Sequence, residues 1–280
     1  MAIYLKKKKM TIGQIFLNAY IVILLIFMIF PMAMALWNSF KLQHLFQDTI
    51  WYPTFPLVVE NLGDAFIDLW PYMLNTIEVG VLGGLGLIFI AAISAYTFAK
   101  MRFYGRKVLY SMVIALMMMP GILTLVPQLE IYRTLNLSKT DNIMALVLPL
   151  WTNGPIFGVF LLTSFFRGIP DDMFEAARID GANEFVCFAG IALPVCMPII
   201  GTLAIMTLSN IWNDYLWPMT VMKDKVTIAA ALVKVYTSEH LSNQPLQFAG
   251  YFVSSLPLIL LFVFCNKYYV EGLIGSSIKL

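Results

Sequence analysis

Charged residues are scarce in this chain. Only 12% of its 280 residues are Asp, Glu, Lys or Arg, whereas 60% are hydrophobic. A soluble domain has about 25% charged and about 45–50% apolar residues. A polypeptide with so few polar side chains needs lipid as its solvent, so the composition excludes a soluble globular protein and predicts an integral membrane protein. The formal net charge of +2 gives no indication of nucleic-acid binding.

Residues for metal and nucleotide chemistry are also scarce. The three cysteines form no C-x-x-C pair, and the two histidines, His44 and His240, lie far apart in the sequence. This excludes a disulfide framework and a zinc site. The chain contains no G-x-x-x-x-G-K-[ST] motif, the phosphate cradle of many ATPases. If ATP drives this protein, another protein must bind it, so we expect no cofactor and no enzymatic activity in this chain.

Long apolar runs, in contrast, are abundant. Six of them approach the length of about 20 residues that a helix needs to cross the hydrocarbon of a bilayer. They occupy residues 12–37, 75–99, 108–129, 142–166, 191–217 and 248–264. We therefore predict an all-α membrane protein with six transmembrane helices in a single domain, residues 1–280. Pro120-Gly121 interrupts the third run and predicts a kink, which leaves backbone carbonyls to be satisfied by neighbours or by a water-lined path.

Lysine and arginine are distributed unequally between the two sides of this topology. With the N-terminus inside, twelve of the 18 basic residues face the cytoplasm, including Lys6 to Lys9, and six face outward. Because cytoplasmic loops carry the excess of Lys and Arg, we expect both termini in the cytoplasm. A cleaved signal peptide ending at Ala33-Met34-Ala35 is an alternative for the first run. That run is longer than the 7–15-residue core of such signals, which favours an uncleaved first span.

Acidic residues of the apolar runs lie near the predicted outer ends of the spans. They are Glu78, Glu130, Asp141 and Asp214. None is near the middle of the bilayer, where an ionisable group is expensive and usually functional. An ion-coupled secondary solute carrier usually needs such a group, so this class is a less favoured alternative. A membrane-embedded enzyme is a third class, but no cluster of acids, Cys or His supports it.

The longest predicted cytoplasmic loop, residues 167–190, has the pattern of two short helices with a break between them. Pro170 suits the first turn of a helix, and Gly181 suits a C-terminal stop with positive φ. Asn183 can cap the next helix. Three apolar residues fall at helical spacing on one face, which predicts an exposed surface for the groove of a partner. They are Met173, Phe174 and Ala177.

The same loop resembles a known motif. Glu175-Ala176-Ala177, followed by Asp180-Gly181-Ala182 and then Leu193-Pro194, is similar to the EAA loop of binding-protein-dependent ABC importer permeases. The resemblance implies the type I permease fold, in which this loop is a coupling helix that docks on a cytoplasmic ATPase. The residues that it implies for ATPase coupling are Met173, Phe174, Glu175, Ala176, Ala177, Arg178, Asp180 and Gly181.

The resemblance extends over nearly the whole chain. Trp212 to Pro218 resembles the segment that closes the fifth span of sugar permeases, and residues 269–279 resemble the tail of the smaller permease of the maltose-type carbohydrate family. Two segments depart from the family pattern. The segment from Val186 to Gly190 lacks the basic residues that are usual in the family. The last residues of the tail, Gly275 to Leu280, also differ from the usual family ending. Both departures concern contacts with the ATPase and leave the class unchanged.

The resemblance also implies partners and a location. The assembly would hold this chain, a second homologous permease, two cytoplasmic ATPase subunits that bind ATP and Mg, and an extracytoplasmic solute-binding protein. The assembly would lie in the cytoplasmic (inner) membrane of a bacterium or archaeon. The solute that it imports would be a sugar, and we expect an oligosaccharide.

Polar and aromatic residues of the predicted fourth and fifth spans are candidates for the sugar path, because sugars stack on indole rings and hydrogen-bond amides. They are Asn153, Asn210, Trp212, Asn213 and Trp217. The alternative is a tryptophan belt at the membrane interface together with interhelical amide hydrogen bonds. From the sequence we favour this alternative.

Overall fold

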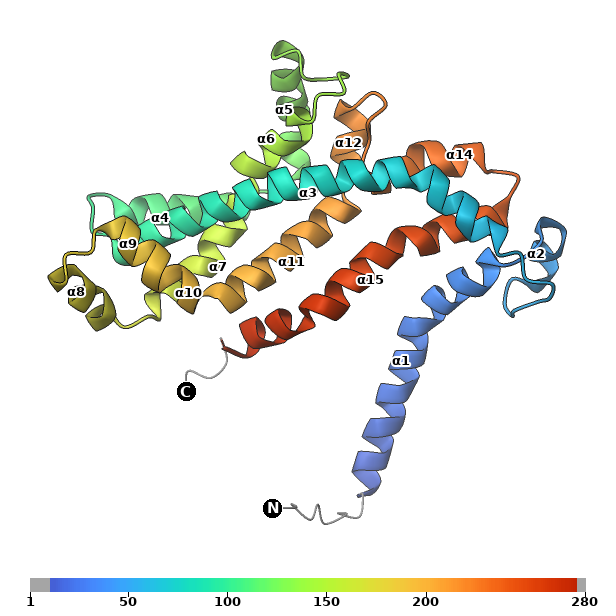
Figure 1. The fold of residues 1–280 in the computed structure, drawn as a ribbon, viewed down its shortest axis with the longest axis horizontal. Coiled ribbons are helices and arrows are strands. Elements are labelled where there is room, and N and C mark those ends of the chain that lie inside the picture. The colour runs from blue at the N-terminus through green and yellow to red at the C-terminus, as the bar shows by residue number, and fades with distance from the viewer. Residues whose placement is uncertain (1–10, 276–280) are drawn as a thin grey trace. The chain divides into compact units, whose positions relative to one another are not determined.

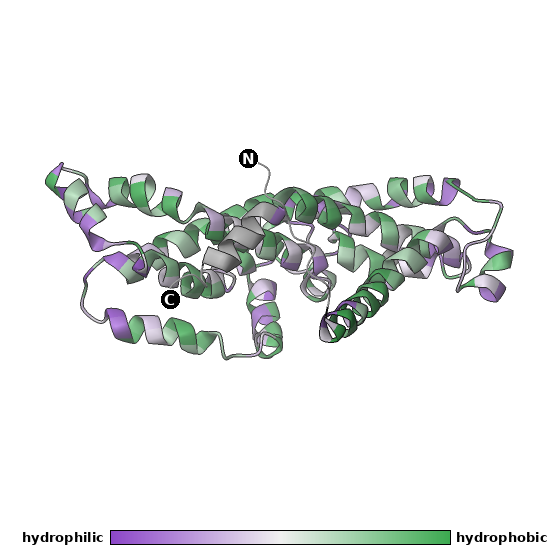
Figure 2. Cartoon of the chain, turned by 90° about the horizontal axis from the view of Figure 1, so that it is seen from below, coloured by the Kyte–Doolittle hydropathy of each residue, from purple (hydrophilic) through white to green (hydrophobic). Residues whose placement is uncertain are grey.

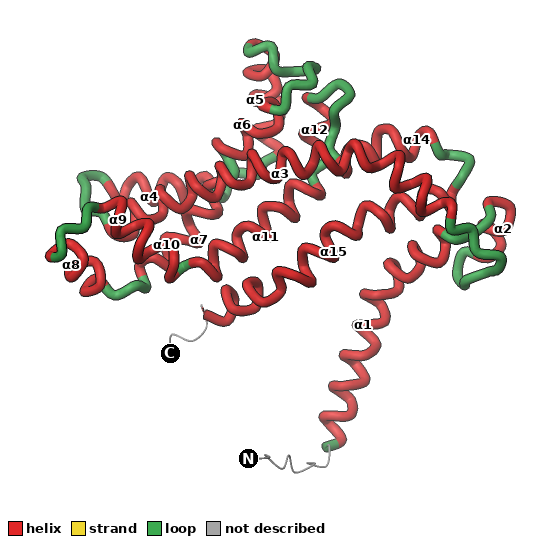
Figure 3. Tube along the Cα trace, viewed as in Figure 1, coloured by secondary structure: helices red, strands yellow, loops and turns green. Residues whose placement is uncertain are grey.

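The computed structural model describes residues 11–275. These residues form helices joined by loops, with no strand among them (Figure 3). The all-α prediction is therefore confirmed for this part of the chain. Lys6 to Lys9 and the tail beyond Gly275, on which part of the orientation and of the resemblance rests, lie outside the described residues.

Four long helices are separated along the chain by shorter elements. The long helices are α1 (Ile12–Ser39), α3 (Glu60–Lys100), α11 (Met197–Asn213) and α15 (Gln244–Gly275) (Figure 1). The shorter elements are α2 (Gln43–Thr49), α4 (Arg106–Leu116), α5 (Ile122–Thr134), α6 (Met144–Thr152), α7 (Pro155–Arg167), α8 (Asp171–Ile179), α9 (Glu184–Cys187), the π-helix η1 (Phe188–Ala192), α10 (Leu193–Val195), α12 (Leu216–Val221), α13 (Ile228–Ala231), the π-helix η2 (Leu232–Tyr236) and α14 (Thr237–Glu239). Hydrophobic residues dominate most of these helices (Figure 2).

Four helical stretches of the described chain are long and apolar enough to cross a membrane. They are Ile12–Ser39, Glu60–Lys100, Met144–Arg167 and Gln244–Asn266. A fifth is added if Glu184–Val195 and Met197–Asn213, which meet at an angle of 77°, form one broken span. These stretches match five of the six predicted spans, although α3 begins at Glu60, well before the predicted start at Asn75.

The predicted third span is divided in the structure. Helix α4 ends at Leu116 and α5 starts at Ile122, so the break includes Pro120-Gly121 as expected from the sequence. Proline has no N–H to donate and restricts the residue before it, which is why a helix stops at this point. The two halves have 11 and 13 residues, too few for either to cross the bilayer alone. The count of six spans stays a prediction.

The chain divides into two compact units, with the divisions falling inside α3, directly after α14 and inside α15. The single-domain organisation of residues 1–280 is not tested by this division and stays a prediction. In the first unit, described for residues 11–67 and 240–253, the end of α1 binds the following loop. Asn38 donates to the carbonyl oxygens of Met34 at 2.9 Å and Ile50 at 3.0 Å, and Asn61 donates to that of Ser39 at 2.8 Å.

The second unit, described for residues 68–239 and 254–275, packs α3 closely against α6 and α7. A Cβ atom at Gly86 would lie 2.0 Å from the indole nitrogen of Trp151, and one at Gly158 would lie 2.8 Å from the Cβ of Ala91. Such small residues let helix backbones approach each other in a membrane. The Trp151 indole donates to the carbonyl oxygen of Leu82 at 3.1 Å across the same contact.

Candidate functional site

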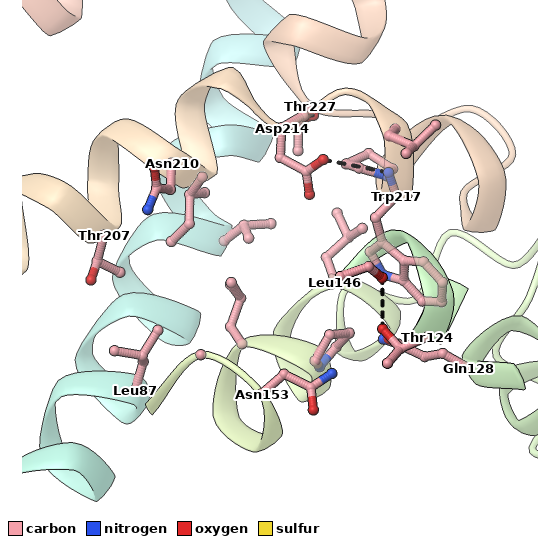
Figure 4. A pocket seen from close by; sticks show the side chains of 18 of the residues that line it. Leu87, Thr124, Gln128, Leu146, Asn153, Thr207, Asn210, Asp214, Trp217 and Thr227 are labelled. Atoms are coloured by element: carbon pink, nitrogen blue, oxygen red, sulfur yellow. Dashed lines mark hydrogen bonds between the residues drawn. The ribbon is translucent and has the colours of Figure 1, made fainter. Parts of the chain in front are cut away.

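A cavity of about 770 Å³ lies within the second unit. Helices α3, α5, α6 and α11 contribute to its walls, together with the segment that leads from α11 through α12 to α13. Most of the lining is apolar. The polar lining residues are Thr124, Gln128, Asn153, Thr207, Asn210, Asp214 and Thr227 (Figure 4). Among the described residues that line the cavity, Asp214 is the only one with an acidic or basic side chain.

The structure brings three of the five predicted path residues to this cavity. Asn153 comes from the turn between α6 and α7, Asn210 from α11 and Trp217 from α12. The Trp217 indole also donates to the carbonyl oxygen of Ala145 at 2.9 Å, so its ring has a fixed orientation in the wall. The ring of Tyr132 supports it edge to face, with the centroids 5.1 Å apart.

The other two predicted path residues do not line the cavity. The Trp212 indole donates to the carbonyl oxygen of Ser254 on α15 at 3.0 Å. The Asn213 side chain donates to the carbonyl oxygen of Ser209 in its own helix at 2.8 Å. Of the five residues, only Asn153, Asn210 and Trp217 therefore line the cavity. The Asn213 bond lies within its own helix, so it is not the interhelical amide hydrogen bond of the alternative. The role of these residues in a sugar path stays a prediction.

The predicted coupling loop folds locally as its residue types indicate. Gly181 has φ +87°, the left-handed conformation that was expected there. The Ala182 amide donates to the carbonyl oxygen of Ala177 at 2.9 Å, and the Gly181 amide donates to that of Arg178 at 3.1 Å. These two bonds form a Schellman motif, which satisfies the last carbonyls of α8. Asn183 then caps α9 by accepting the Val186 amide at 2.9 Å.

The prediction that Phe174 belongs to an exposed docking face is wrong. The Phe174 side chain is 1% exposed and belongs to the core of its own chain rather than to an open surface. Its ring centroid lies 6.2 Å from that of Tyr96, and the Lys100 ammonium lies 4.8 Å from the same ring. Phe174 therefore anchors α8 to α3. Ala177, also expected on the docking face, is partly buried against the same core.

The exposed apolar residues of the loop are partly different from those expected. Met173 is 44% exposed, but Ile179 is 86% and Phe185 71% exposed, and neither of these was predicted as a contact residue. Large apolar side chains that are exposed together on a short segment indicate a binding surface. The signal was present in the sequence, because Ile179 is a large apolar residue at the C-terminal end of the same nine-residue helix.

Two sets of polar contacts hold α8 against its neighbours. Lys100, at the end of α3, pairs with Asp171 at 2.5 Å and donates to the carbonyl oxygen of Ile169 at 2.6 Å. Glu184 of α9 accepts the Arg178 Nε–H at 3.0 Å and the Tyr96 hydroxyl at 2.8 Å. The hydrogen bond from Lys100 holds the pKa of Asp171 below its ordinary value, and the bond to Glu184 raises the pKa of Arg178.

Glu175 lies on the exposed side of α8, and no ion pair of the described residues involves it. Asp180 and Ala176 are exposed as well. A carboxylate beside exposed apolar residues is a suitable contact for a basic group of another protein. We found no group of His, Cys, Asp and Glu side chains among the described residues that could hold a metal ion.

The chain is similar in sequence to known transport proteins. Residues 84–274 match the family described as "Binding-protein-dependent transport system inner membrane component". The osmoprotective compounds uptake permease protein GgtD of Synechocystis sp. is 30% identical over 221 residues, which cover 78% of this chain and 71% of the relative. The arabinooligosaccharides transport system permease protein AraQ of Bacillus subtilis is 27% identical, over 74% of this chain and 73% of the relative.

A solved structure has the same fold. A chain of a bacterial ABC transporter involved in the import of the acidic polysaccharide alginate superposes with a TM-score of 0.78. The alignment covers 94% of this chain and all of the other, at 20% identity. At this identity, the similarity shows the fold alone.

Proposed function

Since this chain belongs to the family of binding-protein-dependent transport system inner membrane components, we propose that it is the transmembrane permease subunit of an ATP-driven importer of a sugar. A second homologous permease would complete the path, and an extracytoplasmic binding protein would deliver the solute. Two cytoplasmic ATPase subunits would bind ATP and Mg, because this chain has no phosphate-binding loop. The observation that carries the proposal is the cavity of about 770 Å³ within a unit that also carries the exposed loop helix α8.

The contact with the ATPase would be made by the exposed side of α8 and the turn after it. Met173, Ala176 and Ile179 provide apolar surface, and Glu175 provides a carboxylate for a basic partner. Arg178 and Asp180 would contribute at the C-terminal end, where Gly181 sets the direction of the chain. Phe174 and Ala177 would act from behind, by fixing the helix to its own core.

The topology that we propose has six spans, with both termini in the cytoplasm of a bacterial or archaeal cell. Helices α4 and α5 would together form the third crossing, bent at Pro120-Gly121. The inequality of Lys and Arg supports this orientation. Contacts in the second unit are consistent with it: Lys100 pairs with Asp171, both expected inside, and Asp141 binds the amides of Asp224 and Lys225, all expected outside.

The cavity lining supports an uncharged, hydroxyl-rich solute. Amide and hydroxyl groups such as Asn153, Asn210 and Thr207 can both donate and accept hydrogen bonds, as sugar hydroxyls require. The carboxylate of Asp214 repels an anion, and it can accept from a sugar hydroxyl. A neutral oligosaccharide fits these groups better than an acidic polysaccharide does.

Transport by the purified assembly tests the proposal. The complex captured through a tag on this chain would be placed in proteoliposomes with ATP on the ATPase side. Uptake would be measured for neutral arabino- and malto-oligosaccharides and for an alginate oligosaccharide, each presented with the binding protein encoded beside the permease. We expect ATP-dependent uptake of a neutral sugar that an uncoupler does not abolish. Uptake that needs an ion gradient and no ATPase would instead support a secondary carrier.

A further inference from the structure

Helix α8 contacts α3 on one side and α9 on the other. Helix α3 lines the cavity itself, and α9 leads along the chain to α11, which also lines it. Helix α3 holds α8 through Tyr96 and Lys100, and Val79 and Leu87 of the same helix line the cavity. On the other side, Glu184 of α9 holds Arg178 of α8. The chain runs from Glu184 through η1 and α10 directly into α11, which supplies several lining residues. The two sets of contacts thus join α8 to both of these walls.

The contacts are suited to transmit a displacement. Tyr96 is 4% exposed and lies at the centre of an aromatic cluster, with ring centroids 5.3 Å from Phe188 and 6.2 Å from Phe166. The Lys100 side chain is 4% exposed, although its partner Asp171 is 75% exposed. Groups that are fixed by packing and also hydrogen-bonded cannot change position independently of their neighbours. A shift of α8 therefore pulls on α3 and α9 together.

We propose that Tyr96, Lys100 and Glu184 are positioning residues that transmit the movement of α8 to both walls of the cavity. The inference rests on the proposed role of α8 as the contact to an ATPase. In this role the phenol of Tyr96 and the carboxylate of Glu184 act as one unit, because each is the hydrogen-bond partner of the other across α3 and α9. None of the three side chains lines the cavity.

The test separates coupling from assembly. Tyr96→Phe removes only the hydroxyl and keeps the buried ring. Glu184→Gln keeps the shape of a side chain that is 42% exposed and removes its charge. Each variant would be purified as the whole complex, and both ATP hydrolysis and solute uptake would be measured in proteoliposomes. We expect the ATPase to be retained and hydrolysis to stay within about twofold, while solute transported per ATP falls about fivefold or more.

Matched controls and a double variant make the result specific. Tyr104→Phe removes a hydroxyl from a fully exposed tyrosine, and Glu130→Gln breaks an exposed ion pair with Arg133 inside α5. Both should keep the unmutated ratio of transport to hydrolysis. The double variant of Tyr96 and Glu184 should lose no more than the worse single variant, because the two groups form one contact. Lys100→Met should also lower the ratio, and Lys100→Arg should restore most of it.

Each outcome decides the inference. An unchanged ratio in Tyr96→Phe and Glu184→Gln overturns it, and so does loss of the ATPase from the complex, since these contacts would then only build the docking surface. If Tyr96→Phe fails to accumulate in the membrane, Glu184→Gln decides, because its carboxylate is partly in water and its loss leaves no cavity. Failure of the unmutated chain to retain any ATPase would contradict the proposed function instead, which keeps the two failures distinguishable.

Discussion

Replacement of Gly181 by valine would place a β-branched residue at φ +87°. No heavy atom lies within 4 Å of the Cβ that the substitution adds. The free-energy cost of the substitution therefore includes no steric conflict between this Cβ and the rest of the protein. The penalty comes from the backbone alone. A left-handed conformation costs a non-glycine residue roughly 1–2 kcal/mol, and a β-branched residue more than most.

The strain acts on the two bonds of the Schellman motif. If the introduced valine leaves the left-handed region, the Ala182 amide loses the Ala177 carbonyl and the chain leaves α8 in another direction. A penalty of about 1.4 kcal/mol corresponds to a tenfold change in the ratio of native to non-native turns. The exposed side of α8 would then be misaimed in a larger share of molecules, while the membrane-spanning helices keep their packing.

The assay compares this variant with two others. Gly105 has φ +80° and also has no heavy atom within 4 Å of an added Cβ, so Gly105→Val carries the same backbone strain at the start of α4. Gly181→Asn is the second, because asparagine tolerates the left-handed region. Co-purification of the ATPase and ATP-dependent uptake should fall in Gly181→Val, by at most about tenfold, which is the change in the ratio of native to non-native turns. Gly181→Asn should recover most of both activities, and Gly105→Val should keep them.

One set of results would refute this reasoning. If Gly181→Val retains the ATPase and transports at the unmutated rate, the direction of the chain after α8 does not matter for docking. If Gly105→Val is as impaired as Gly181→Val, general strain in the loops expected in the cytoplasm explains the effect, and the assignment of α8 as the coupling element loses its support.

Three further predictions concern the topology, the burial of Phe174 and the hydrogen bonds of Asp141. Cysteine placed at Lys225 should react with an impermeant thiol reagent added to intact cells and cysteine at Arg106 should not; the reverse labelling would invert the proposed topology. Phe174→Ala should destabilise the detergent-solubilised protein by about 3–5 kcal/mol, whereas Met173→Ala, 44% exposed before substitution, should change the thermal midpoint little; equal effects would contradict the burial of Phe174. Asp141 accepts the amides of Asp224 and Lys225 at 2.8 Å each, and these bonds lower its pKa. Asp141→Ala should therefore speed hydrogen exchange at both amides roughly tenfold, the equivalent of about 1.5 kcal/mol for a lost bond to a charged group. Because the folded pKa is depressed, protection should persist from about pH 7 to about pH 5 and decline only as the pH falls below the ordinary carboxyl range; protection that is already lost at about pH 6 would assign these bonds to another group.

Properties that depend on neighbouring residues could be predicted from the sequence. The stop at Gly181, the cap at Asn183 and the break at Pro120-Gly121 are all present in the structure. Each of them is decided by the backbone preferences and hydrogen bonds of a few adjacent residues. Five of the six apolar runs also correspond to helical stretches that can cross a membrane, since length and hydropathy are sums over a continuous segment.

The direction in which a side chain points could not be predicted in this way. Met173 and Phe174 are adjacent apolar residues of one short helix, and its periodicity allowed either to face a partner. Tyr96 and Lys100, far earlier in the chain, bury Phe174 and leave Met173 half exposed.

The two tryptophans illustrate the same division between sequence and tertiary structure. Trp212 and Trp217 belong to one short motif, yet only Trp217 reaches the cavity, because the Trp212 indole finds its acceptor on α15. The amino-acid sequence alone determined the membrane class, the local stop at Gly181, the cap at Asn183, the break at Pro120-Gly121 and the family. Only tertiary packing decided which side chains face the cavity, the core or the surface offered to a partner, because burial depends on contacts between segments that are distant in the sequence.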